Sequence, residues 1–159
     1  MSMNFARRRF SAVLARGVAW VGVWATTKAL AATDVATPDV LLQRAHAISG
    51  GALIRTGRVR IDTPRLADNG HSVPITVRVE SAMTAQDHVR RIILVSESNP
   101  RPLIATFHLT LKSGRAEITT RVRLNKTQRV IALAELSDGS FWSDSAEVIV
   151  TESACLDAD

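Results

Sequence analysis

Apolar and polar side chains alternate along most of the chain from residue 58 to residue 153. In residues 72–80, for example, Val73, Ile75, Val77 and Val79 occupy every second position. A period of two places the apolar side chains on one face of a β-strand. This alternation, replaced in one case by a nearly continuous apolar run, predicts seven strands, in the segments 58–63, 72–80, 89–98, 103–111, 116–124, 128–136 and 145–153.

The same pattern predicts which side chains face inward. The apolar run in 89–98 indicates a central strand. In 103–111, the expected inner face consists of Ala105, Phe107, Leu109 and Leu111. In 116–124, it consists of Ile118, Thr120, Val122 and Leu124. The arginines that we expect on outward faces are Arg58, Arg60, Arg78, Arg121 and Arg123.

Residues typical of turns separate these strands. They form four clusters: Asp68-Asn69-Gly70, Asn99-Pro100-Arg101-Pro102, Lys112-Ser113-Gly114 and Ser137-Asp138-Gly139. Short strands with one polar face, separated by such turns, are typical of an antiparallel sandwich. We therefore predict an all-β fold, an immunoglobulin-like antiparallel β-sandwich of about seven strands. The Cys-Trp-Cys signature of true immunoglobulin domains is missing from the sequence.

One short amphipathic helix is expected before the first strand, at about residues 38–49. Thr37 is a suitable N-cap, and Pro38 suits the first helical position. Four apolar side chains then follow at helical spacing: Val40, Leu41, Ala45 and Ile48. The pair Gly50-Gly51 is expected to end the helix.

The first 31 residues have the sequence pattern of an export signal. Arg7, Arg8 and Phe10 form the R-R-x-F core of a twin-arginine signal. The apolar stretch that follows, residues 17–32, is shorter than the roughly 20 residues of a membrane span. The alternatives are an amphipathic N-terminal helix and a single membrane anchor.

Residues 29–31, Ala-Leu-Ala, fit a cleavage site before Ala32. We therefore predict a signal peptide at 1–31 and export to the periplasm by the twin-arginine pathway, with no membrane anchor after cleavage. The predicted organisation continues with an N-terminal segment and its helix at 32–51, the sandwich at 52–152 and a C-terminal arm at 153–159.

Removal of this leader changes the charge of the protein. The whole chain has a formal net charge of +5, from 20 basic and 15 acidic side chains. Five of the basic side chains and none of the acidic ones lie in residues 1–31, so the remaining chain is formally neutral. Nucleic-acid binding requires a clustered positive field, so we expect no nucleic-acid partner.

The remaining candidates for chemistry are dispersed. The four histidines, His46, His71, His88 and His108, stand singly and form no zinc-binding pattern, so they are interpreted as surface side chains. Asp68 belongs to a turn-like triplet. We predict no catalytic residue, no metal site and no cofactor. For the outward arginines, a solvated face is one interpretation, and a patch that contacts an anion or a partner is the other.

Cys155, the only cysteine, lies past the last predicted strand and five positions from the end of the chain. Terminal residues are loosely held unless they dock on the fold. An exposed thiol there is suited to covalent attachment of a cargo. Prenylation requires a cysteine one position nearer the end. An incidental cysteine and a disulfide between two copies of the chain remain alternatives, since one thiol cannot form an internal disulfide.

Several short motifs along the chain together point to one known protein family. The twin-arginine leader is one. The others are the segment Pro64, Ala67, Asp68, Asn69, Gly70, Val73, Pro74 and Ile75; the segment Asn99, Pro100, Pro102, Ala105 and Phe107; the strand Thr120, Arg121, Val122 and Arg123; and the strand Glu147, Val148, Val150 and Thr151, followed by the cysteine. Their order and spacing extend over more than a hundred residues. In these motifs the chain resembles the SoxY family of sulfur carriers in the thiosulfate-oxidising Sox system.

The resemblance implies a non-enzymatic carrier with a sandwich fold. It implies a heterodimer with SoxZ, a second small β-sandwich, and a sulfur cargo held on Cys155 as a thioconjugate while periplasmic sulfur-oxidising enzymes act on it. A non-catalytic interaction module and a thiol-redox protein that uses the same cysteine are the alternatives.

The arm departs from the Gly-Gly-Cys-Gly-Gly tip of SoxY. Here Ala154, Leu156 and Asp157 surround the cysteine, which resembles a SoxY-related paralogous group with an Ala-Ala-Cys-Ile-Glu type arm. Leucine adds bulk, and the conformational freedom of glycine is lost. Glu152, Asp157, Asp159 and the terminal carboxylate are negative charges that disfavour the thiolate and repel anionic cargo. We therefore expect a different client enzyme, and the sequence leaves the identity of the cargo open.

Overall fold

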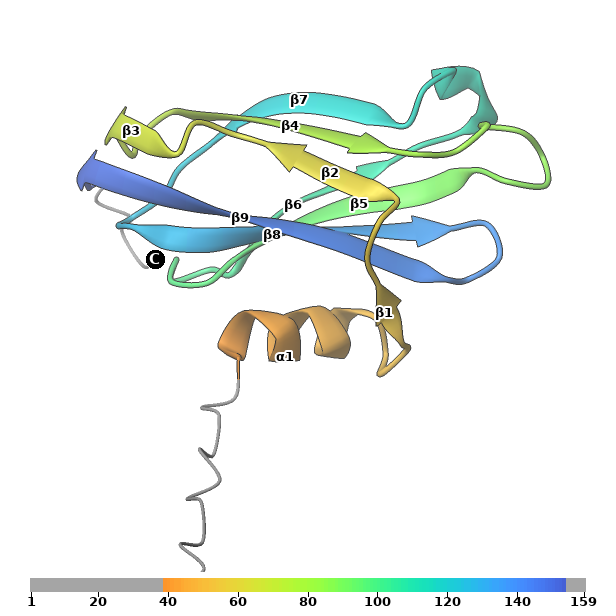
Figure 1. The fold of residues 1–159 in the computed structure, drawn as a ribbon, viewed down its shortest axis with the longest axis horizontal. Coiled ribbons are helices and arrows are strands. Elements are labelled where there is room, and N and C mark those ends of the chain that lie inside the picture. The colour runs from red at the N-terminus through yellow and green to blue at the C-terminus, as the bar shows by residue number, and fades with distance from the viewer. Residues whose placement is uncertain (1–38, 154–159) are drawn as a thin grey trace, which may run out of the picture. The chain divides into compact units, whose positions relative to one another are not determined.

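The computed structural model describes residues 39–153 (Figure 1). The predicted signal peptide, with Arg7, Arg8 and Phe10, lies outside the described residues, and so does Cys155. These two features stay predictions.

Within residues 39–153, nine strands form two sheets that pack face to face (Figure 1). The larger sheet contains β1 (Ile54–Arg55), β3 (Leu66–Asn69), β5 (Val89–Ser96), β6 (Leu103–His108), β8 (Gln128–Leu136) and β9 (Phe141–Glu152). Its order is β1-β9-β8-β5-β6, with β3 also paired to β9. The smaller sheet has the order β2 (Val59–Asp62), β4 (Val73–Val79) and β7 (Glu117–Val122). The predicted immunoglobulin-like sandwich is confirmed.

The main core lies between the two sheets. Side chains at alternate positions of β4, such as Ile75 and Val77, are completely buried there. Together with apolar side chains of β5 and β8, such as Ile92 and Ala132, they form one continuous cluster. Burial of apolar surface is the main source of stability in such a fold.

A second core lies on the other face of the larger sheet, under helix α1 (Val40–Ile48). Leu41 and Ala45 of the helix pack with Ile93 of β5 and Leu133 of β8. Strand β5 is therefore covered on both faces and lies between β8 and β6. This arrangement explains its continuous apolar run and confirms that it is a central strand.

The helix begins slightly later than predicted. Its N-cap is Asp39, whose carboxylate accepts hydrogen bonds from the backbone N–H of Leu41 at 3.0 Å and of Leu42 at 3.3 Å. Val40 was expected on the buried face but is 46% exposed, because Leu41 and Ala45 define the face that contacts the sheet. Gly50 follows the helix with a φ of 67°, a conformation that favours glycine. No helix among the described residues is long and apolar enough to cross a membrane.

Strands β1 and β3 add to the predicted set. Strand β3 includes Asp68 and Asn69, which were interpreted as part of a turn, and the turn itself begins at Gly70. The backbone of β3 pairs with β9, so the strand does not depend on apolar alternation. Leu111 was expected on an inner face, but this prediction is wrong. Strand β6 ends at His108, and Leu111 lies in a 3-10 turn (Leu111–Ser113) with its side chain exposed.

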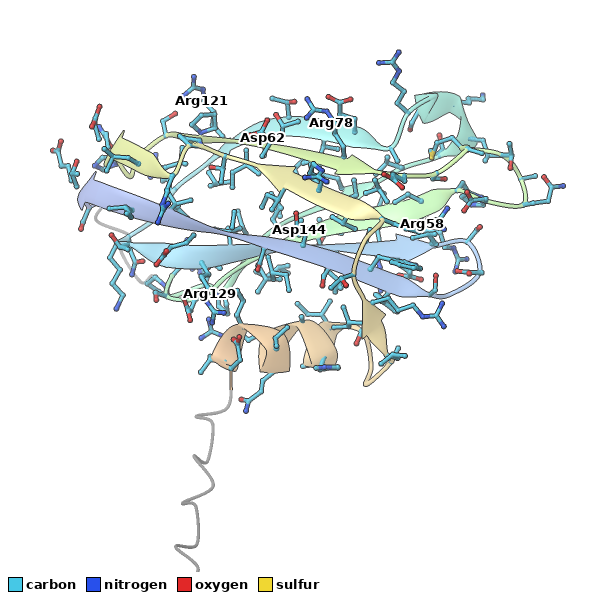
Figure 2. All side chains as sticks on the ribbon, in the orientation of Figure 1. Arg58, Asp62, Arg78, Arg121, Arg129 and Asp144 are labelled. Carbon is cyan, nitrogen blue, oxygen red and sulfur yellow. The ribbon has the colours of Figure 1, made fainter. Side chains whose placement is uncertain are left out.

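An ion cluster attaches the start of α1 to the larger sheet. Figure 2 labels its central residue, Arg129, next to the helix. The guanidinium of Arg129 on β8 donates to both carboxylate oxygens of Asp39 at 2.8 Å and to Glu97 at 2.8 Å. These hydrogen bonds lower the pKa of Asp39 from 3.8 to about 2. They also lower the pKa of Glu97, with Arg129 as the main cause.

Candidate functional site

The candidate site is built around the end of strand β9, after which the predicted C-terminal arm, residues 153–159, follows in the sequence (Figure 1). Ser153 is the last described residue, and Cys155 follows two positions later. The structure therefore describes the part of the fold that directly precedes the predicted carrier cysteine. We call residues 149–152 of β9, together with β3 and the turn 70–72, the arm base.

Strand β3 holds the end of β9 through a parallel ladder, in which Ala67 faces Val150 and Asn69 faces Glu152. The N–H of Gly70 donates to the carbonyl of Glu152 at 2.8 Å. The hydroxyl of Thr151 donates to the carbonyl of Asp68, also at 2.8 Å. The main chain is thus hydrogen-bonded up to the residue before the arm.

The loop between β7 and β8, residues 123–127, holds the same end of β9 on another side. The N–H of Val150 donates to the hydroxyl oxygen of Thr127 at 2.9 Å. The N–H of Leu124 donates to the carbonyl of Gly70 at 2.8 Å, which joins this loop to the turn before β4. Strand β3 with the turn 70–72 and the loop 123–127 are far apart in sequence. Together they hold the end of β9.

A buried amide network fastens that loop to the one between β5 and β6. Asn99 is only 8% exposed, and its amide donates to the carbonyl of Arg123 at 2.8 Å. Its carbonyl oxygen accepts from the N–H of Asn125 at 3.1 Å and from the amide of Gln128 at 2.8 Å. Buried polar groups that are fully paired in this way keep loops in one conformation.

A recess of about 350 Å³ lies beside this network. We call it the arginine recess. Its lining comes from the loop before β6, the start of β6 and the end of β7: Asn99, Pro100, Arg101, Leu103, Ile104, Arg121, Val122 and Arg123. Among these described lining residues, three are arginines and none is acidic. Arg121 also donates from its guanidinium to the carbonyl and hydroxyl oxygens of Ser72, both at 3.2 Å.

The outward arginines of the smaller sheet do not all share one role. Arg58 pairs with Asp87 at 3.0 Å, and Arg78 pairs with Glu117 at 3.2 Å. Figure 2 shows Arg58 and Arg121 toward opposite ends of the sandwich. Arg121 and Arg123 line the recess and form no ion pair with a described carboxylate. The structure thus separates paired arginines from recess arginines.

The histidines are not brought together. His46, His71 and His108 are exposed on three different parts of the fold. His88 is half-buried, with Nδ1 at 3.0 Å from the carbonyl of Thr84. Across residues 39–153, no three histidine, cysteine, aspartate or glutamate side chains gather in a way that could hold a metal ion.

Comparison with protein families identifies residues 44–155 with the family described as "Sulfur oxidation protein SoxY". The chain belongs to the SoxY family. The matched region extends from helix α1 to Cys155 and so includes the whole sandwich and the first part of the arm. A search of curated proteins found no significant match.

Solved structures share the fold of this SoxY-family chain. The sulfur carrier protein SoxY from Chlorobium limicola f thiosulfatophilum is 24% identical, covers 70% of this chain and 91% of its own, and has a TM-score of 0.58. A superoxide reductase (neelaredoxin) from Ignicoccus hospitalis is 17% identical over 59% of this chain and 80% of its own, with a TM-score of 0.53. A putative superoxide reductase from Thermotoga maritima is 20% identical over 62% and 87%, with a TM-score of 0.51. At these identities, the likeness concerns the fold alone.

The motifs that resemble SoxY lie mainly at the arm end of the sandwich. Ala67 is buried in β3, and Gly70 donates the hydrogen bond to Glu152. Asn99 centres the amide network. From the sequence, Gly70 and Asn99 were interpreted as turn residues, and the support that Thr127 and Gln128 provide was not predicted. The family resemblance was the available signal for Asn99, whereas no sequence pattern singles out Thr127.

Proposed function

We propose that this protein is a non-enzymatic carrier of sulfur compounds that holds its cargo covalently on Cys155. Membership of the SoxY family is the observation that carries the proposal. The solved SoxY that shares the fold is described as a sulfur carrier protein. A firmly held arm base, with the only thiol of the chain three residues beyond Glu152, suits a body that presents a cargo to other proteins.

In the attachment step that we propose, the ionised thiol forms a sulfur–sulfur bond with an anion such as thiosulfate. Cys–S⁻ and S₂O₃²⁻ become Cys–S–S–SO₃⁻, and the two electrons released pass to a partner redox enzyme. The thiolate is the reactive form of cysteine. The negative charges of Asp157 and Asp159 oppose both the thiolate and the approach of an anion, so attachment depends on a partner that shields them.

We further propose that the protein works in the periplasm, after twin-arginine export, as a heterodimer with a SoxZ-like β-sandwich. The leader motif of Arg7, Arg8 and Phe10 supports the location. The SoxY family supports the partner. The altered residues around Cys155 support a client enzyme different from that of the glycine-armed carriers, as in the related group with an Ala-Ala-Cys-Ile-Glu type arm.

Replacement of Cys155 in the host tests the carrier role. Cys155→Ser should abolish oxidation of the sulfur compound in vivo, because serine cannot form the sulfur–sulfur bond. The stability of the sandwich should not change, because residue 155 lies beyond the last strand. Ser153→Ala is the matched control within the arm and should retain activity. Full activity of Cys155→Ser would refute the carrier role and leave a non-catalytic interaction module.

A further inference from the structure

The arginine recess lies along the open edge of the sandwich. Strand β6 ends the larger sheet and β7 ends the smaller one, so each has a strand neighbour on one side only among the described residues. On the opposite side, β2 and β9 approach each other, and the N–H of Ile61 donates to the carboxylate of Asp144 at 3.0 Å. The edge between β6 and β7 is therefore the side on which a cavity of about 350 Å³ remains. That volume falls in the range of small-ligand pockets.

The charge of the recess is suited to an anion. Arg121 and Arg123 line it, and no acidic side chain stands among its lining residues within the described part of the chain. By contrast, a smaller hollow between β2 and β4 combines Arg58, Arg60 and Arg78 with Glu80. Arginine presents a planar group of donors that binds the oxygens of an oxyanion in pairs. Apolar side chains of the recess wall, such as Ile104 and Val122, reduce the exposure of a bound anion to water.

The recess is also held in shape. The loop that carries Arg101 is fixed through Asn99, which donates to the carbonyl of Arg123 at 2.8 Å. Arg121 is restrained by its two hydrogen bonds to Ser72. Because these groups are positioned before any ligand arrives, little ordering is required on binding.

The recess lies within reach of a cargo on the arm. Arg121 bonds to Ser72, and Gly70, two residues earlier, bonds to Glu152 at the end of β9. The path from the Arg121 guanidinium through Ser72 and Gly70 to Glu152 is at most about 16 Å long, because it consists of a short piece of chain and two hydrogen bonds. The three residues from Glu152 to Cys155 span up to about 11 Å, to which the side chain and its cargo add several ångström.

We propose that the arginine recess binds an oxyanion of sulfur, of the sulfate and thiosulfate class, through Arg121 and Arg123. The choice of sulfur as the central atom rests on the proposed carrier function, whereas the affinity for an oxyanion rests on the recess alone. The ligand is either a free anion or the sulfonate end of a cargo attached to Cys155.

Titration of the full chain with thiosulfate, followed by the backbone amide signals in NMR spectra, tests this site. Chloride at equal ionic strength is the reference. The Cys155→Ser protein is used so that no covalent attachment can occur, and this choice separates the test from that of the carrier role. We expect saturable shifts centred on residues 99–104 and 121–123.

Arg121→Ala and Arg123→Ala should each weaken binding about tenfold, the loss expected for a hydrogen bond to a charged group. Both side chains are exposed, so both variants should fold. Arg60→Ala is the matched control, an exposed arginine of the same sheet that does not line the recess. Shifts that do not saturate, or that Arg60→Ala weakens as much as Arg121→Ala does, would overturn the proposal.

A second titration distinguishes the two sources of the anion. Tetrathionate converts Cys–S⁻ to Cys–S–S–SO₃⁻ and releases thiosulfate, which is removed before the measurement. If the loaded protein no longer binds free thiosulfate in the recess, the attached cargo occupies it. If the loaded protein binds as well as the Cys155→Ser protein, the ligand is the free anion. Binding that appears only after Asp157→Asn and Asp159→Asn would overturn the proposal, because the arm's own carboxylates would then be the occupants.

Discussion

At the residue scale, Arg129 decides how firmly the start of α1 is held on the larger sheet. It bonds to both oxygens of Asp39 and lowers the pKa of that carboxyl from 3.8 to about 2. A carboxyl whose pKa is lower in the folded protein adds stability above its unfolded pKa and loses it as pH falls through the folded value. The contribution of this pair should therefore be full at neutral pH and should disappear between about pH 4 and pH 2.

Urea unfolding of the wild type and Arg129→Gln across this pH range checks the expectation. The substitution should lower the unfolding midpoint near neutral pH and should have little effect below about pH 2, where Asp39 is mostly protonated. Glu97 acts in the same direction, since Arg129 also lowers its pKa. Arg60→Gln, an exposed arginine without an ion pair among the described residues, is the control. A constant difference between wild type and Arg129→Gln at every pH would contradict this account.

Single residues differ in how well their role can be predicted from the sequence. Cys155 stands out because it is the only thiol and lies past the last strand. Arg129 and Asp39 are 90 positions apart, and neither belongs to a pattern that predicts their contact. Arg101 and Arg121 line the same recess only because β6 and β7 are edge strands on the same side of the sandwich. Topology determines which strands lie at an edge, so the recess could not be predicted from the alternation of residues.

At the element scale, β9 depends on neighbours that hold its last residues in place. The hydroxyl of Thr127 accepts the N–H of Val150, whose side chain is buried. Thr127→Val keeps the shape of the side chain and leaves this N–H unpaired, which should cost about 1–3 kcal/mol of unfolding free energy. Thr127→Ser keeps the hydroxyl and should stay within about 0.5 kcal/mol of the wild type.

Urea denaturation measures the stability of both variants, and hydrogen exchange locates the effect. Exchange at the amides of Val150 and Glu152 should accelerate in Thr127→Val and not in Thr127→Ser. Equal behaviour of the two variants would show that the hydroxyl of Thr127 does not hold the arm base.

The elements that sequence analysis predicted are those with one buried face. Strand β4 alternates because Val73, Ile75 and Val77 enter the core while Arg78 faces solvent. Strand β3 lacked such a signal, since only Ala67 of its four residues is buried and its pairing uses the backbone. Strand β1 has two residues, too few for a period to be recognised.

At the scale of the whole molecule, the buried residues that stabilise the sandwich are distinct from the residues of the proposed functional site. The two cores lie between the sheets and under α1. The arm base, the amide network and the arginine recess gather where β9 ends. A carrier benefits from this division, because the tip can differ between relatives without change to the core. The acidic and bulkier residues around Cys155 are a change of this kind.

The central claim is that Cys155 holds a sulfur cargo. It is tested most directly by the intact mass of the protein purified from its host during growth on an oxidisable sulfur compound. We expect an added mass that corresponds to sulfur or to a sulfur oxyanion, located on Cys155 by peptide analysis and removed by a thiol reductant. A bare thiol on every molecule under these conditions would contradict the account.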